Sequence, residues 1–197
     1  MVVPEKHTGL KSAAQSVITL DVSVPWGYVL PLFHVIRAMS RPDITDERLS
    51  RLYDLWVERR GMRPLPDRGD FDPVRLKPWL GNLALIEVGH DGEYRYRLYG
   101  TNFVFRFGVE MTGRTVEDLP PEQSAAIRQD YDAVVESAWP LSRRYTSGFD
   151  IIDVHRRLDS QRVETWERLV LPLANGDTRV AMLMVAAYYL PDIQPAP

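Results

Sequence analysis

The segment TRVAMLMVAAYYL, residues 178–190, constrains this sequence more than any other stretch. Side chains of an extended strand alternate between two faces, and here the residues of both faces are apolar. A strand of this kind is typical of the centre of a sheet that is covered on both sides. We therefore expect a covering layer on each face, and the helix predicted at residues 46–60, or a second protomer, is the candidate for one of them.

An amphipathic helix is predicted over residues 46–60, within TDERLSRLYDLWVERRG. Asp46 and Glu47 stand in its first turn, where acidic side chains interact favourably with the helix dipole, and Gly61 follows its end. The inward face is marked by four apolar residues at helical spacing, namely Leu49, Leu52, Tyr53 and Trp56.

The segment YRYRLYGTNFVFRFG, residues 94–108, changes its period at Gly100. Before this glycine it alternates as the second strand of a hairpin, paired with LALIEV at residues 83–88 across a GHDG turn. Alternation predicts an apolar face with Tyr94, Tyr96 and Leu98, and a solvent-facing side with Arg95, Arg97 and Tyr99. After the glycine, Thr101 can cap a short helix that Gly108 ends. Its inward side would hold Phe103, Val104 and Phe107.

A second clear helix is predicted over residues 121–138, with a proline at its start and Trp139-Pro140 after its end. Two strands follow it before the apolar last strand. The first, at residues 141–158, is one long strand or a strand broken at Gly148, and the second is at residues 162–173. This order is that of an α+β fold with a five-stranded, mostly antiparallel sheet, whose helices lie between strands two and three.

The length of 197 residues corresponds to about one domain. We place that domain at residues 46–192, after an N-terminal extension, 1–45, that we expect to be flexible or covered by a partner. Residues 193–197 form a C-terminal tail.

Composition excludes several classes of function. The chain has no cysteine, which excludes thiol nucleophiles, cysteine metal sites and the cysteinyl adduct of flavin photochemistry. A net charge of −3 argues against nucleic acid as a partner.

The apolar stretch at residues 22–36 is too short to span a membrane. We expect it to be a buried or partner-covered segment, with a membrane-surface anchor as the alternative. The N-terminus has no signal-peptide pattern, so we expect a cytoplasmic protein.

Several motifs together resemble the PAS family, and more closely a group of small bacterial PAS-domain proteins that occur as stand-alone chains. They are LYDLWVERRGMRPLPDRGDFDP, KPWLGNLALIEV, YRYRLYGT, MTGRTVEDL and ETWERLVLPL, in this order. The resemblance extends from about Leu52 to Leu190. It implies a PAS fold, with a pocket between the sheet and the helices after strand two, and with an N-terminal helix that caps the sheet and can form a dimer.

The resemblance also implies a function without catalysis, as a sensory or regulatory module for signal transduction. A module without an output domain must act through another protein, so we expect a homodimer and a protein partner. The cap and dimer helix would use Leu49, Leu52, Tyr53 and Trp56. Candidate residues of the ligand pocket are Tyr96, Leu98, Phe103, Val104, Phe107, Trp166 and Arg168. The same aromatic residues also suit an ordinary packed core.

Arg168 stands out because it is a charge among apolar strand residues. It lies either at a sheet edge, or it reaches a buried carboxylate or an anionic ligand, which arginine binds with two parallel hydrogen bonds. Trp166 shares its strand face. We expect no cofactor, although non-covalent flavin stays open. Haem is disfavoured because it needs a histidine in the pocket, whereas His90 is in a turn and His155 lies beside two arginines.

Two alternatives from other classes stay open, a small α+β cone-fold enzyme of the hydratase or isomerase type and a ligand-free dimeric adaptor. The enzyme would need acid–base residues. The pair Asp70 and Asp72 is part of a turn signature, and alternation places Asp150 and Asp153 on opposite strand faces. The sequence has no phosphate-binding loop, nucleophile elbow or histidine metal spacing. We therefore expect no catalytic residue and no metal site.

Overall fold

The computed structural model describes residues 40–148 and 163–191, which lie within one unit of the chain, Ala38–Pro197. The helices are α2 (Glu47–Arg60), α3 (Pro73–Leu76), α4 (Thr101–Phe107) and α5 (Pro121–Ser137). The strands are β1 (Leu83–Val88), β2 (Tyr94–Tyr99), β3 (Leu141–Gly148), β4 (Val163–Leu173) and β5 (Met182–Tyr189). The predicted α+β fold is confirmed; the second half of the strand predicted at 141–158 lies outside the described residues.

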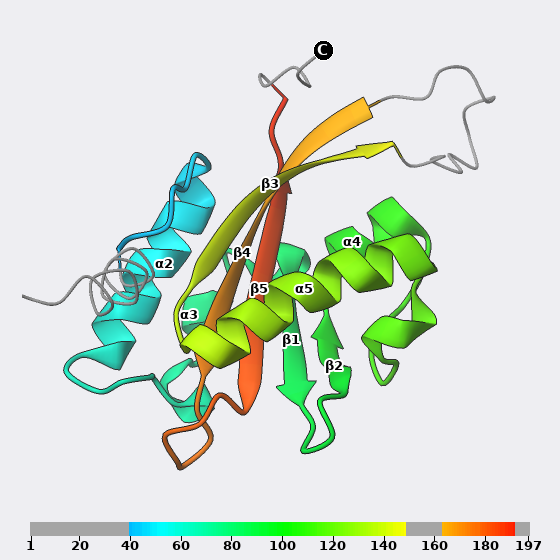
Figure 1. Ribbon diagram of the computed structural model, residues 1–197. Coiled ribbons are helices and arrows are strands. Elements are labelled where there is room, and N and C mark those ends of the chain that lie inside the picture. Colours follow the sequence, from blue (N-terminus) through cyan, green and yellow to red (C-terminus); the bar gives the residue numbers. More distant parts are fainter. Residues whose placement is uncertain (1–39, 149–162, 192–197) are drawn as a thin grey trace, which may run out of the picture. The chain divides into compact units, whose positions relative to one another are not determined.

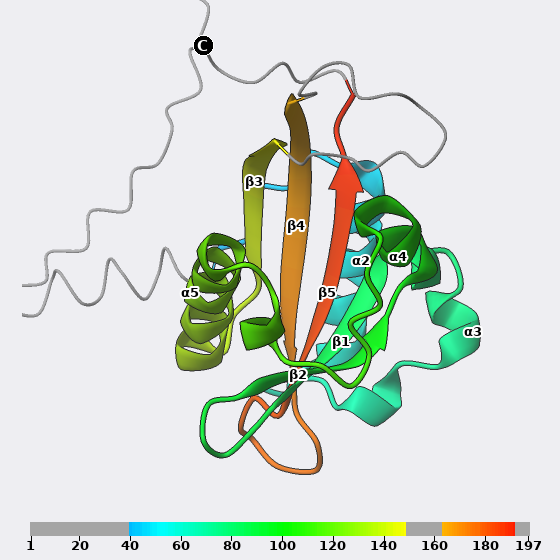
Figure 2. The same cartoon turned by 90° about the vertical axis from the view of Figure 1, so that its right-hand side faces the viewer.

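The five strands form one sheet in the order β2-β1-β5-β4-β3, and all neighbours are antiparallel. The apolar last strand, β5, is the central strand, as its two apolar faces predict. Helix α2 covers one face of the sheet and α5 the other (Figure 1). Figure 2 shows the same sheet with α4 and α5 in front of it and α2 behind.

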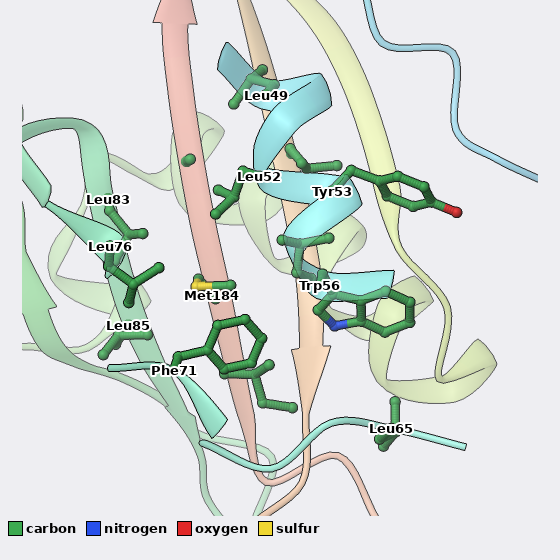
Figure 3. Close-up of a cluster of buried hydrophobic side chains, with 14 of the residues drawn as sticks. Leu49, Leu52, Tyr53, Trp56, Leu65, Phe71, Leu76, Leu83, Leu85 and Met184 are labelled. Carbon is green, nitrogen blue, oxygen red and sulfur yellow. The ribbon is translucent and has the colours of Figure 1, made fainter. Parts of the chain in front are cut away.

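Helix α2 begins and ends where the sequence predicts. The Asp46 carboxylate caps it by accepting hydrogen bonds from the backbone N–H groups of Arg48 and Leu49, at 2.8 and 3.3 Å. Gly61 ends it with a φ of 55°, which favours glycine. All four predicted inward residues are buried against the strands, as Figure 3 shows for Leu52 and Trp56 beside Met184 of β5. The covering layer on this face is therefore the chain's own helix.

A β-bulge in β2 corrects the predicted alternation. Leu85 is opposite Leu98 and Ile86 is opposite Tyr96, so Arg97 is an extra residue without a partner in the register. Because side chains alternate along a strand, one extra residue makes every following side chain point to the opposite face of the sheet. Leu98 consequently packs on the α2 side of the sheet, and Tyr99 takes its place on the α5 side.

Glu167 of β4 anchors the start of α2. Its side chain is fully buried, and its two carboxylate oxygens accept hydrogen bonds from the backbone N–H groups of Thr45, at 2.9 and 3.0 Å, and of Asp46, at 2.6 Å. The preceding residues also contact the domain, since the Trp139 indole N–H donates to the carbonyl of Ser40 at 3.0 Å. Residues 40–45, assigned by sequence to the extension, thus lie against the sheet and α2.

We expect Glu167→Gln to destabilise the domain by about 1–3 kcal/mol, because a buried amide N–H₂ replaces an oxygen that accepts two backbone hydrogen bonds. Amide hydrogen exchange in the first turn of α2 should accelerate. Glu47→Gln is the matched control on the same helix, because Glu47 is exposed and pairs with the exposed Arg51. Equal exchange rates in the two variants would show that Glu167 does not hold α2.

Candidate functional site

A chain of aromatic rings runs through the layer between the sheet and the helices α4 and α5. It runs from Tyr96 through Tyr99 to Phe103, with centroid distances of 5.5 and 5.3 Å. It continues from Phe103 to Phe107 and Trp166 at 6.2 and 5.7 Å, and from Trp166 to Tyr189 at 6.1 Å. These rings come from β2, α4, β4 and β5, so the layer is assembled from segments far apart in the sequence.

The structure brings most of the predicted pocket residues together. Tyr96, Phe103, Phe107 and Trp166 belong to one cluster on this side of the sheet. Val104 is half-buried on α4, outside the cluster that the described residues form, and Leu98 faces α2 because of the bulge.

The short helix that carries Phe103 is positioned by a close backbone approach. Gly100, and not the predicted Thr101, is the residue that precedes α4. A side chain at Gly100 would place its Cβ 2.3 Å from the carbonyl oxygen of Gly81, so only glycine fits. Gly108 ends the helix in the left-handed conformation, as predicted.

Arg168 lies in the same layer and binds a buried carboxylate. It is 9% exposed on β4, which is not an edge strand, and it forms an ion pair with Asp130 of α5, which is 1% exposed. Of the alternatives that the sequence left open, the buried carboxylate is therefore the one observed, and the sheet-edge position is wrong. Trp166 lies on the same face, as predicted.

A second arginine shares this carboxylate. Arg143 of the edge strand β3 is the cross-strand neighbour of Arg168 and donates from Nε to Asp130 at 2.5 Å. Like charges directly opposite on neighbouring strands repel, and the shared carboxylate offsets this repulsion. Because Arg143 is about half exposed, the site is connected to solvent at the β3 edge.

Tyrosine side chains surround the ion pair. The Arg168 guanidinium lies 5.2 Å from the centroid of the Tyr145 ring. Burial raises the pKa of Tyr145 and of Tyr131, and the positive charge of Arg168 opposes this only in part. Burial likewise raises the pKa of Tyr96 and Tyr99. These phenols stay protonated at neutral pH, so the layer offers hydroxyl donors beside a guanidinium.

The pKa of Arg168 itself is raised. Burial alone would lower it, but the interactions with Tyr131, Tyr145 and Asp130 outweigh that penalty. Arg168 is therefore a permanent positive charge inside the domain.

A second buried ion pair lies next to Trp166, near one end of the aromatic chain. Glu164 of β4 pairs with Arg106 of α4 and accepts a hydrogen bond from the Trp166 indole N–H at 3.2 Å. This pair ties α4 to the sheet, and the sequence analysis did not identify it.

An open cavity of about 320 Å³ lies elsewhere, next to the turn between β1 and β2. It is lined by Asp91, Gly92, Glu93, Thr115, Glu117 and Arg128. Arg128 pairs with Glu117 across it. None of the predicted pocket residues lines this cavity.

The candidate acid–base residues have structural contacts. Asp70 pairs with Arg63 at 2.6 Å, and Asp72 caps α3 by accepting from the Val74 N–H at 2.8 Å. His90 is exposed in its turn, whereas Asp150, Asp153 and His155 lie outside the described residues.

Among residues 40–148 and 163–191, no three His, Cys, Asp or Glu side chains are grouped to hold a metal ion. No helix in that part of the chain combines the length and the apolar character needed to cross a membrane.

Asp130 and Arg143 are residues of this ion-pair site that sequence reasoning missed. A signal was present, because Asp130 follows Ile127 by three positions and precedes Val134 by four, which places it on the inward face of α5. A carboxylate on an inward helix face needs a cationic partner, and Arg168 was already singled out.

A comparison with models of protein families identifies the family of this chain. A family model described as PAS domain matches residues 44–184, most of the chain, so the protein belongs to the PAS domain family. It is therefore a module of the sensory type. A search of the curated proteins finds no match. Among solved structures, a sensory box sensor histidine kinase from Vibrio cholerae is similar, with 18% identity and a TM-score of 0.39 over 59% of this chain and 88% of that chain.

We expect Arg168→Met to destabilise the domain by about 1–3 kcal/mol, because Asp130 loses the buried one of its two cationic partners and keeps only the half-exposed Arg143. The double variant with Asp130→Leu should recover most of this loss, since apolar side chains replace both charges. Urea unfolding of both single variants and the double variant measures the coupling. Arg51→Met, at an exposed ion pair, is the control and should be nearly neutral. Additive effects of the two site substitutions would contradict the pairing.

Stability should fall at alkaline pH. Unfolded tyrosines ionise near pH ~10, whereas burial raises the pKa of Tyr145, Tyr131, Tyr96 and Tyr99 in the folded state. The contribution of these phenols is therefore present below that pH and is lost as pH rises through the folded pKa values. The free energy of unfolding should decline with pH between about 8 and 11, the range around the phenol pKa. The decline should be less steep in Tyr145→Phe than in the wild type. Identical slopes in the two proteins would refute this origin.

Proposed function

We propose that this protein is a regulatory module that binds a small ligand in the aromatic layer beneath α4 and α5 and passes the signal to another protein. The observation that carries the proposal is the difference between the two faces of the sheet. The α2 face is packed mainly with aliphatic side chains such as Leu52, Leu171 and Met184. The α5 face combines aromatic rings with phenol hydroxyls and a buried guanidinium.

That combination suits ligand recognition. Ligand sites are mostly apolar and aromatic, with a few polar groups that fix orientation. The layer supplies these polar groups as Arg168 and the surrounding tyrosines. The pocket residues that remain candidates are Tyr96, Phe103, Val104, Phe107, Trp166 and Arg168, and Tyr99 joins them in place of Leu98. We propose no resident cofactor and no catalytic residue.

A ligand-free adaptor is the second candidate. The ring contacts of 5.3 to 6.2 Å along the aromatic chain favour it, because rings at these distances pack against one another as in an ordinary core. The cone-fold enzyme, by contrast, is a different fold from the PAS domain of this chain.

Output would use the outer face of α2. Leu49, Leu52, Tyr53 and Trp56 contact the chain's own sheet, so a dimer through α2 needs other residues. Val57 and Met62 are exposed apolar residues at its C-terminal end, with 36% and 103% exposure. We propose a homodimer through this end of α2, in a bacterial, cytoplasmic protein.

Native mass spectrometry of the freshly purified protein, with an absorbance spectrum, tests the ligand. We expect extra mass on each protomer that disappears on denaturation, or absorbance in the visible range. An apo mass alone would contradict the ligand-binding function and leave the adaptor.

The dimer has its own test. Val57→Asp with Met62→Asp should convert the dimer to a monomer without loss of stability, because both side chains are exposed. Light scattering after size exclusion measures the mass. Leu52→Asp should instead unfold the domain, because it buries a charge in the core. A dimer that persists in the double variant would place the interface elsewhere.

A further inference from the structure

The buried guanidinium of Arg168 is not fully used by its partners. A guanidinium carries five N–H donors in a rigid fork. One amino group of Arg168 donates to Asp130, but its Nε is buried and has no hydrogen-bond partner within the described residues. Such a donor is costly unless a further acceptor reaches it. The unused edge of the fork is the part that a second carboxylate oxygen would engage.

The surroundings of Arg168 suit a carboxylate. The Arg168 guanidinium lies 5.2 Å from the centroid of the Tyr145 ring. Burial raises the pKa of Tyr145 and of Tyr131, so both are neutral phenols that can donate hydrogen bonds. Aromatic side chains, Trp166 among them, and aliphatic side chains form the rest of the layer. A guanidinium with phenol donors among aromatic rings matches a small organic acid with an apolar body.

The net charge of the site would be neutralised by one more anion. Arg168 and Arg143 contribute two positive charges and Asp130 one negative charge, so the group carries a net charge of +1. An added carboxylate would neutralise it. Asp130 would not be left unpaired, because Arg143 already binds its other oxygen at 2.5 Å from the half-exposed β3 edge.

We propose that Arg168 recognises a small-molecule carboxylate, and that Asp130 is the internal carboxylate that occupies Arg168 when this ligand is absent. On binding, the ligand carboxylate takes the Arg168 fork, and Asp130 stays with Arg143. Because Asp130 belongs to α5 and Arg168 to β4, the exchange releases the tie between this helix and β4, while Arg143 keeps the helix tied to the edge strand β3. This inference rests on the proposed ligand-binding function and names the ligand's class.

Acetate and benzoate are the probes, with benzamide as the neutral counterpart of benzoate. Acetate is small enough to replace the carboxyl group of Asp130. Two-dimensional NMR of arginine Nε–H groups, at constant ionic strength maintained with chloride, reports directly on Arg168, whose signal is identified by its absence in Arg168→Lys. Both carboxylates should shift this signal in the wild type, and benzamide should not.

Variants separate exchange from simple binding. Asp130→Asn removes the competing charge and should tighten carboxylate binding at least about tenfold, because the binding-competent state is no longer a minor one. Arg168→Lys should abolish binding, and because this variant has no Arg168 signal its binding is followed by the backbone amide shifts recorded in the same titrations. Arg51→Lys, at an exposed pair, should not change binding. If Asp130→Asn does not fold, the comparison of wild type with Arg168→Lys still decides whether Arg168 binds carboxylates.

The outcomes are distinct. An Arg168 signal that neither carboxylate shifts in the wild type overturns the inference. Binding that only Asp130→Asn shows also overturns it, because Asp130 would then be a permanent partner of Arg168. Carboxylate binding that survives in Arg168→Lys also overturns it. If native mass spectrometry finds a ligand that is not an acid, the proposed function stands while this inference fails. If neither a retained ligand nor carboxylate binding is found, both fail.

Discussion

Two adjacent residues of β4, Glu167 and Arg168, tie a helix to each face of the sheet. Neighbouring residues of a strand point to opposite faces, so Glu167 reaches the start of α2 while Arg168 reaches Asp130 of α5. Both charges are buried, and each is stabilised by a partner that only the folded chain provides. Both covering helices therefore depend on the placement of this one strand.

The two faces of the sheet have different chemistry because different helices cover them. Helix α2 brings a stripe of large apolar residues, and the layer beneath it is mostly aliphatic. On the other face, rings from β2, α4, β4 and β5 meet around a guanidinium and phenols. The first layer stabilises the fold, and the second is the layer in which we propose that a ligand binds.

Sequence periodicity predicted the elements well, because it depends on local spacing. The limits of α2, the central place of β5 and the shared face of Trp166 and Arg168 all follow from it. The bulge in β2 did not follow from it. The bulge at Arg97 has no local signal in alternating residues, yet it replaces Leu98 by Tyr99 in the aromatic layer. The register between β1 and β2 decides which of Leu98 and Tyr99 lies in that layer.

Residue order alone was enough to establish the α+β class, the PAS resemblance and the need to cover both faces of the last strand. It also showed that Arg168 needs either solvent or a partner of opposite charge. The identity of that partner is a property of the packed chain, because Asp130 lies 38 residues away along the sequence. Helical period places Asp130 inward, but only the packing of α5 on β3 and β4 brings its carboxylate between Arg143 and Arg168.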